Sequence, residues 1–183
     1  PGSKNTVADL EILRKSGLAK AILNSYGKGH AVYGICGGYQ MMGEEIHDPN
    51  GVEGSVPFMP GLGLLPVVTT LTDEKRTVQS EFTFRNETGL CKGYEIHMGE
   101  TKLRGGIQLA KLSDGQADGC FVNEKTWGTY LHGIFDNLQV IQSILKVCGK
   151  ETAFQEFDYA AYKNEQYDKL AALLRESCDM DYI

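Results

Sequence analysis

The 183-residue sequence contains no apolar run that approaches the roughly 18 to 20 residues of a membrane-spanning helix. It also lacks a basic, apolar signal segment at its start and any cluster of Lys and Arg, and its formal net charge is -6. These absences argue against a membrane or a nucleic acid as the main partner. We therefore expect a cytoplasmic protein.

The sequence has little that suggests metal or disulfide chemistry. Its five cysteines are widely spaced, and none belongs to a Cys-x-x-Cys pair. An odd, scattered set predicts free thiols in a reducing compartment and no metal site in this chain. Each cysteine must therefore be judged by its neighbours; the five are Cys36, Cys91, Cys120, Cys148 and Cys178.

The remaining composition, 42% hydrophobic and 23% charged, is that of an ordinary globular domain. Periodicity predicts strands over residues 30–35, 64–71, 76–84, 93–98, 107–112 and 127–131, with closing helices over 137–148 and 159–177. We expect one α/β domain over residues 1–183, with two short helices after Thr6 and a long Gly- and Pro-rich loop over 48–64. The turn-like opening at residues 1–6, with no strand before it, leads us to expect a fragment of a longer chain.

A Gly-x-nucleophile-x-Gly pattern stands at the end of the first predicted strand, as Gly34-Ile35-Cys36-Gly37-Gly38. This is the form of a nucleophile elbow, in which a sharp strand-to-helix turn presents the nucleophile above the sheet. The residues two before and two after must be small because strand and helix pack closely there. The pattern predicts Cys36 as a nucleophile; the alternative is a small buried cysteine beside a tight turn.

The same turn should aim the first N–H groups of the following helix at Cys36. Such donors favour a thiolate over a thiol, and the Gly37 N–H could also stabilise a developing oxyanion. The other four cysteines lack this glycine frame. We therefore expect Cys36 to be the reactive one.

A nucleophilic cysteine needs a base, and His132 is the best placed of the four histidines. It ends a predicted strand just before Gly133, where a side chain can project over the carboxyl edge of a sheet. The alternative is a strand-end histidine bonded to local backbone. His97 is the second candidate, and strand alternation puts it on one face with Glu95. Those two could line the pocket or form a buried pair between strands.

Four ordered motifs carry a family resemblance: residues 1–6 (PGSKNT), 34–40 (GICGGYQ), 93–99 (GYEIHMG) and 130–135 (YLHGIF). Together they resemble the C-terminal glutaminase domain of cobyric acid synthases, a corrinoid-type branch of the class I (triad) glutamine amidotransferases. The match in order and spacing runs over nearly the whole chain. The resemblance implies a flavodoxin-like three-layer sandwich with a mainly parallel central sheet.

The resemblance also implies an activity and its residues. L-Glutamine would be cleaved through a Cys36 thioester with His132 as base, Gly37 and Gly2 as oxyanion donors, and Gln40, Glu95 and His97 near the substrate. The ammonia would serve ATP-dependent amidation of adenosylcobyrinic acid a,c-diamide to cobyric acid in cobalamin biosynthesis. ATP and Mg would belong to an N-terminal synthetase domain, with no cofactor in this domain.

One departure from the wider class concerns the third catalytic group. Many triad enzymes carry Glu two residues after the histidine, whereas this sequence has Ile134. Glu95, a water network or a residue of the synthetase domain could take its place. Rival functions are a glutaminase for peptidoglycan-precursor amidation, a cysteine hydrolase or peptidase on a related fold, and a non-catalytic docking module.

Overall fold

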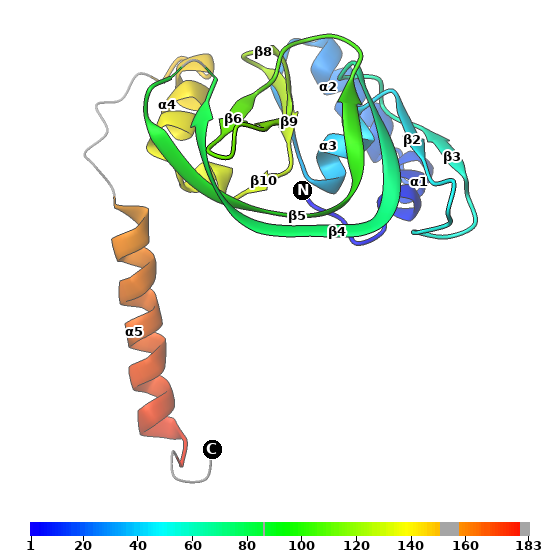
Figure 1. Ribbon diagram of the computed structural model, residues 1–183. Helices are drawn as coiled ribbons and strands as arrows, with labels where there is room; N and C mark the ends of the chain where they lie inside the picture. The colour runs from blue at the N-terminus through cyan, green and yellow to red at the C-terminus, as the bar shows by residue number, and fades with distance from the viewer. Residues whose placement is uncertain (86, 151–157, 180–183) are drawn as a thin grey trace. The chain divides into compact units, whose positions relative to one another are not determined.

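The computed structural model describes residues 1–85, 87–150 and 158–179 (Figure 1). Contacts between residues divide the chain into two compact units, Pro1–Lys150 and Glu151–Ile183. The helices of the first unit are α1 (Thr6–Lys15), α2 (Leu18–Gly27), α3 (Gly37–Met42), the 3-10 helix η1 (Ile134–Asp136) and α4 (Leu138–Val147). Its strands are β1 (Val32–Ile35), β2 (Glu45–His47), β3 (Phe58–Pro60), β4 (Val67–Phe84), β5 (Leu90–Leu103), β6 (Ala110–Leu112), β7 (Ala117–Asp118), β8 (Cys120–Asn123), β9 (Thr126–Thr129) and β10 (Leu131–His132).

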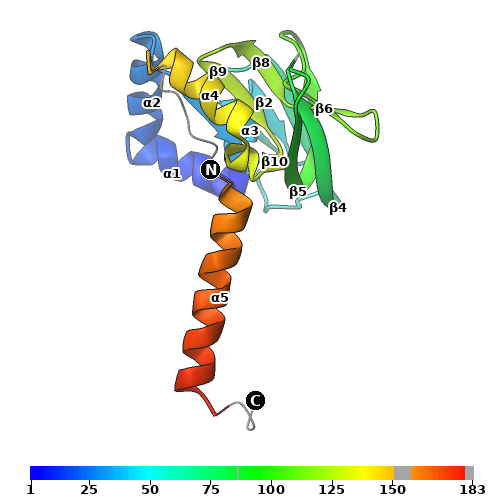
Figure 2. The same cartoon turned by 90° about the vertical axis from the view of Figure 1, so that its left-hand side faces the viewer.

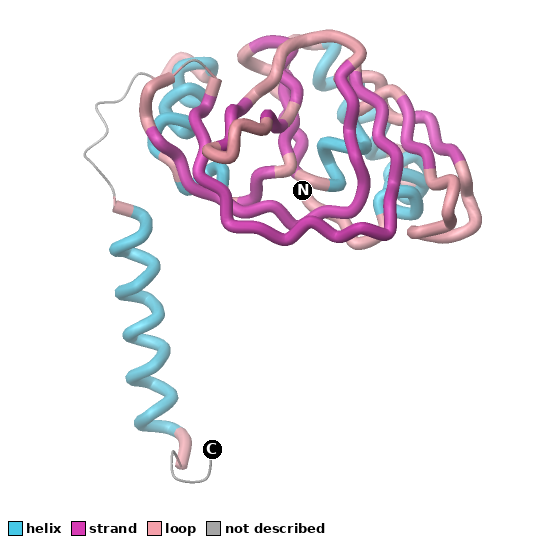
Figure 3. The backbone as a smooth tube through the Cα atoms, viewed as in Figure 1, coloured by secondary structure: helices cyan, strands magenta, loops and turns pink. Residues whose placement is uncertain are grey.

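The strands form two sheets, and in Figure 3 the long β4–β5 hairpin of the larger sheet curves along the lower edge of the first unit. The smaller sheet has the order β1-β9-β8. The larger has the order β10-β5-β4-β2-β3, with β6 also paired to β4 and β7 paired to β6. Helices and mixed sheets together place the first unit in the α/β class, as the sequence predicts.

The direction of the strands differs from the expectation of a mainly parallel sheet. Parallel pairing joins β1 to β9 and β2 to β4, whereas β5 pairs antiparallel with both β4 and β10. The physical reason is the β4–β5 hairpin, whose strands pair through a short connection, while parallel neighbours need a long crossover. Among the described residues, antiparallel pairing therefore predominates.

Strand β4 joins the two strands predicted over 64–71 and 76–84. The register against β5 shifts between Thr70 and Lys75, which marks a bulge where the hairpin bends. On either side of the bulge β4 buries a different cluster: Val67 packs with the cluster around Tyr39, and Phe82 and Phe84 pack with the cluster around Trp127. The strand continues because both of its ends are buried.

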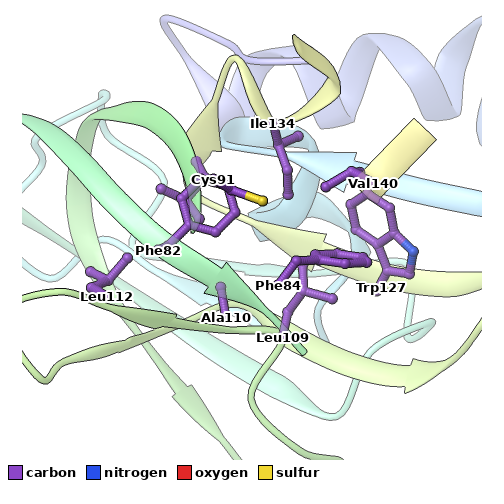
Figure 4. Packing of buried hydrophobic residues seen from close by; sticks show 10 residues of the cluster. Phe82, Phe84, Cys91, Leu109, Ala110, Leu112, Trp127, Ile134 and Val140 are labelled. Carbon is purple, nitrogen blue, oxygen red and sulfur yellow. The ribbon is translucent and has the colours of Figure 1, made fainter. Parts of the chain in front are cut away.

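The largest apolar cluster lies between the β4–β6 layer and the β9–α4 segment. Phe82, Phe84, Trp127, Ile134 and Val140 belong to this cluster (Figure 4), and all five side chains are at most 2% exposed. Burying a large aromatic or aliphatic side chain contributes about 1.5–3 kcal/mol. This cluster fixes the segment from β9 through η1, which carries His132.

Within the first unit, helices α1 and α2 lie at the left in Figure 2, and strands β4, β5 and β6 of the larger sheet lie at the right. Asn5 caps α1 by accepting a hydrogen bond from the Ala8 N–H, and Asp9 sits in the first turn, where the helix dipole favours an acid. In the second unit, α5 (Tyr159–Ser177) begins at Asp158, whose side chain accepts from the Ala161 N–H. No helix in the described parts of the chain is long and apolar enough to cross a membrane.

Candidate active site

Cys36 occupies the turn between β1 and α3. Its backbone has φ 54° and ψ -114°, a left-handed conformation that is costly for a residue with a side chain. The turn is held because the Cys36 N–H donates to the Thr129 carbonyl of β9 and the Cys36 carbonyl accepts from the Gln40 N–H. The chain thus keeps a strained residue at this point by bonding it on both sides.

Gly34 and Gly38 allow the close packing that this turn requires. A methyl group on Gly34 would lie 2.8 Å from the Tyr39 Cα, and one on Gly38 would lie 2.8 Å from the Pro1 carbonyl oxygen. Both distances are below any normal contact, so neither position accepts a side chain without movement of the backbone. The glycine frame predicted from the sequence is confirmed as a packing requirement.

The surroundings of Cys36 favour the thiol, whereas the turn was expected to favour the thiolate. Burial raises the pKa of Cys36, although hydrogen bonds from the Gly37 and Ser3 N–H groups lower it and the Glu53 charge raises it further. The expectation failed because desolvation of the nearly buried side chain outweighs two backbone donors. The protein therefore holds Cys36 as a thiol, which needs a base for activation.

His132 ends β10, and its imidazole is neutral in this environment. Burial lowers the pKa of His132, the Ile96 backbone opposes that effect by hydrogen bonding, and His97 lowers it further. The Nε2 atom is buried and has no hydrogen-bond partner among the described residues. A neutral imidazole with an unpartnered nitrogen is able to accept a proton.

Backbone from two other segments brings Cys36 and His132 together. The Cys36 thiol donates to the Ile96 carbonyl at 3.4 Å, and the Ile96 backbone also bonds His132. A methyl group on Gly2 would lie 3.3 Å from His132 Cε1 and 3.9 Å from Cys36 Sγ. The predicted nucleophile and base therefore border one small space, closed by Gly2 and Ile96.

Ile134 and Glu95 are the two positions in this chain that concern the third catalytic group. Ile134 is 1% exposed and packs in the apolar cluster around Trp127, and an isoleucine side chain cannot orient the imidazole by hydrogen bonding. Glu95 is bonded by Arg76 at 2.8 Å, by Ser80 at 2.8 Å and by His97 at 3.4 Å. Burial alone would raise the pKa of Glu95, but these hydrogen bonds hold it at about 2. Glu95 is thus an ionised carboxylate that is already engaged with other partners.

His97 lies on the same face of β5 as Glu95, as strand alternation predicts. Its ring stacks on Tyr130 with 3.7 Å between centroids, and its Nδ1 lies 3.2 Å from the Gly99 carbonyl oxygen. A cavity of about 640 Å³ opens on this face, and Glu95, His97 and Tyr130 are among its lining residues. Glu95 thus links β5 to β4 through Arg76 and Ser80, as a buried pair between strands predicts, whereas neither Cys36 nor His132 is among the residues that line this cavity.

Gln40, expected near the substrate, is 3% exposed and bonded within the protein. Its Oε1 accepts from the Thr6 hydroxyl, and its Nε2 donates to the Met98 carbonyl and to the Tyr130 hydroxyl. These bonds tie α3 to the start of α1 and to β5. The Gln40 side chain therefore already has partners for both its oxygen and its nitrogen within the protein.

Ser3 was missed by sequence reasoning, because its contribution comes from the backbone. Its N–H bonds the Cys36 thiol together with that of Gly37, whereas Gly2 adjoins the thiol without such a bond being evident. The signal available in the sequence was only the motif at residues 1–6. Ile96 was missed for the same reason, since it acts through its carbonyl.

No group of three or more His, Cys, Asp or Glu residues that could hold a metal ion occurs in the ranges 1–85, 87–150 and 158–179. The remaining cysteines divide by exposure: Cys91 and Cys120 are buried, whereas Cys148 and Cys178 are exposed. Burial raises the pKa of both Cys91 and Cys120 to about 11. They behave as packing residues.

Comparisons with known proteins identify the family to which this chain belongs. The family model described as the CobB/CobQ-like glutamine amidotransferase domain matches residues 1–140. Proteins named cobyric acid synthase are 52% identical in Parabacteroides distasonis, 51% in Phocaeicola vulgatus and 47% in Bacteroides fragilis. These alignments cover 100%, 98% and 100% of this chain but 38%, 37% and 38% of the relatives. The chain thus spans less than two fifths of their length.

A solved structure named "Crystal structure of glutamine amidotransferase" superimposes with a TM-score of 0.58 at 19% sequence identity. The match covers 81% of this chain and 77% of that one, and it supports the fold alone. The family model covers more than half of the chain and includes both Cys36 and His132. The chain belongs to the CobB/CobQ-like glutamine amidotransferase domain family.

Proposed function

We propose that this chain hydrolyses L-glutamine at Cys36 and supplies the ammonia to an ATP-dependent synthetase. Two observations on His132 carry this proposal: its buried Nε2 has no partner among the described residues, and the Ile96 backbone bonds both its imidazole and the Cys36 thiol. A buried nitrogen without a partner costs free energy, and such sites persist where they serve chemistry. Family membership supplies the reaction class.

In the proposed reaction, the Cys36 proton passes to His132 Nε2 as the sulfur attacks the carboxamide carbon of glutamine. The C–N bond then breaks while the imidazolium returns the proton to the leaving nitrogen, giving ammonia and a γ-glutamyl thioester. Water next loses a proton to His132 and adds to the thioester. Cleavage of the C–S bond releases glutamate and restores the thiol.

The oxyanion of each tetrahedral intermediate needs two donors. Gly37 N–H and Ser3 N–H are the best supported, because both already bond the Cys36 sulfur, and Gly2 lines the same space. We assign the Cys36 turn as a nucleophile elbow on its left-handed backbone and glycine frame. We also propose that the parallel β1–β9 pair with its helices corresponds to part of a flavodoxin-like three-layer sandwich.

The acceptor reaction is proposed from the relatives. Proteins named cobyric acid synthase match this chain over less than two fifths of their own length, which leaves room for an N-terminal synthetase domain that would use ATP and Mg. The ammonia would then amidate adenosylcobyrinic acid a,c-diamide to cobyric acid in cobalamin biosynthesis, in the cytoplasm. The assignment of residues 1–183 to one glutaminase domain stays a prediction.

The test is glutamate release from L-glutamine, measured for the wild type and for Cys36→Ala and His132→Ala. Each protein is assayed alone and with the N-terminal part of a cobyric acid synthase, and each is checked for folding by thermal unfolding. We expect both variants to lose activity while they stay folded. A wild type that is silent in both settings would instead favour a docking module.

Labelling of Cys36 is best done with a glutamine-analogue chloroketone. Simple alkylation by iodoacetamide would also modify Cys148 and Cys178, because both are exposed. Protection by L-glutamine should therefore be seen at Cys36 and not at those two positions. If ester or peptide analogues labelled Cys36 as well as the glutamine analogue does, a cysteine hydrolase would be supported instead.

A further inference from the structure

We propose that Tyr94 is a positioning residue for His132, whose stacked ring holds the imidazole where other triad enzymes use a carboxylate. This inference rests on the proposed function, since it assigns a role within the same site. Tyr94 belongs to the motif at residues 93–99, next to Glu95. The structure supplies the missing contact.

The two rings lie face to face. Their centroids are 5.1 Å apart and their planes differ by 9°, the arrangement of a stacked pair. The register of β10 against β5 sets the contact, because His132 pairs directly with Tyr94 and opposed residues of an antiparallel pair share a face. The stack is therefore built into the sheet.

Gly93 allows the two strands to approach closely enough for this contact. A methyl group on Gly93 would lie 2.6 Å from the His132 carbonyl oxygen, so any side chain there would push β10 away. On the other side, a methyl on Gly133 would lie 3.9 Å from Tyr94 Cε1. The Gly93-Tyr94 and His132-Gly133 pairs thus pack against each other as one unit.

The imidazole needs such support because other candidates are engaged elsewhere. Ile134 is buried in the core, and Glu95 is bonded to Arg76 and Ser80. Strand alternation also puts Glu95 on the opposite face of β5 from Tyr94. With one ring edge bonded to the Ile96 backbone, a stacked neighbour restrains the rotation that this bond leaves free.

The effect of removing the ring should be moderate. Tyr94 is 37% exposed, so its loss leaves no internal cavity and the fold should persist. Stacked aromatic pairs of this kind correspond to about a three- to tenfold change in a rate or equilibrium. We therefore expect Tyr94→Ala to lower kcat by about three- to tenfold with little change in KM, because the substrate is held by other groups.

The experiment compares Tyr94→Ala with Tyr94→Phe, which keeps the ring and removes the hydroxyl. Leu90→Ala serves as a matched control, because Leu90 lies on the same strand and is 56% exposed. Glutamate release is measured for all three with the synthetase part present. Tyr94→Phe and Leu90→Ala should match the wild type. An unchanged kcat in Tyr94→Ala, or an equal loss in Tyr94→Phe, would overturn the proposal.

A second measurement does not depend on turnover. The His132 Cε1 proton is followed by NMR against pH in the wild type and in Tyr94→Ala. Loss of the ring should move this signal downfield, because the ring current is gone, and should raise the pKa of His132, because burial is the main cause of its lowering. If the signal does not move, the Tyr94 proposal is refuted even if the chain is inactive. If the signal shifts but the wild type is inactive, only the proposed glutaminase function is refuted.

Discussion

Gly2→Ala places one methyl group between the proposed nucleophile and base. The added carbon would lie 3.3 Å from His132 Cε1, 3.7 Å from Cys36 Cβ and 3.9 Å from Cys36 Sγ. Carbon atoms prefer about 3.5–4.0 Å, so the imidazole must move by a few tenths of an ångström. The methyl also occupies space that the substrate carbonyl needs in order to reach the thiol.

A misplacement of about 1 Å can cost about a hundredfold in rate. The smaller shift and the lost space together predict a fall in kcat/KM of about ten- to a hundredfold, which is about 1.4 to 2.7 kcal/mol of transition-state stabilisation. Stability should change by less than about 1 kcal/mol, because Gly2 does not have a left-handed backbone and alanine restricts the unfolded chain.

The assay is glutamate release at several glutamine concentrations, with thermal unfolding measured on the same samples. Gly27→Ala is the matched control, because a methyl group on Gly27, the last residue of α2, meets nothing within 4 Å. That variant should keep full activity and gain slightly in stability. If Gly2→Ala worked within twofold of the wild type, the space that Gly2 borders could not be the reaction site.

Three further predictions concern charge. Since burial lowers the pKa of His132 below 6.5, kcat/KM should stay level down to that pH and fall only in more acidic solution; an acid limb centred above pH 6.5 would contradict the assignment. Burial raises the pKa of Asp118 to about 6, so its ionisation opposes folding: the stability is full below about pH 4 and is lost as the pH rises through 6. Asp118→Asn should remove about 3 kcal/mol of this pH dependence, measured by urea unfolding between pH 4 and 7.5, and an unchanged slope would argue against it. Ile134→Glu should destabilise the fold by about 3 kcal/mol or more, because the carboxylate enters the apolar core, and a gain in activity would show that it reaches His132.

Much of the site could be predicted from local sequence. The glycine frame around Cys36 and the strand-end position of His132 follow from steric limits that act over a few residues. Their meeting follows from β1 and β9 lying side by side in the sheet. Local rules therefore predicted two side chains that the structure places around one space at Gly2.

The residues that complete the site could not be predicted in the same way. Ser3 and Ile96 act through backbone atoms, which every residue type carries, so the sequence holds no mark of their role. Tyr94 acts through strand register, which depends on pairing partners far along the chain. The thiolate expectation for Cys36 failed similarly, because desolvation depends on how deeply the packed chain buries the sulfur.

The fold was predicted less completely than the site. Periodicity located α4 and the longer strands but missed the short strands β2, β3, β7 and β8, of which β3 lies inside the loop predicted over 48–64. It also read β4 as two strands, since the bulge near residues 71–74 interrupts the alternation without ending the strand. The family resemblance implied a mainly parallel sheet, and that prediction of strand direction was wrong for the larger sheet. Pairing direction depends on which segments meet, and the long hairpin decides it here.

The hydrogen bond from the Cys36 N–H to the Thr129 carbonyl has a consequence for dynamics. Only Tyr130 and Leu131 separate Thr129 from His132. The proposed nucleophile and base are therefore connected by one backbone hydrogen bond and a very short stretch of chain. A displacement of β9 would therefore move the Cys36 turn and the end of β10 together. The exchange rate of this single amide proton with deuterium should therefore report how often the pair comes apart, and its slowing should accompany any ligand that organises the site.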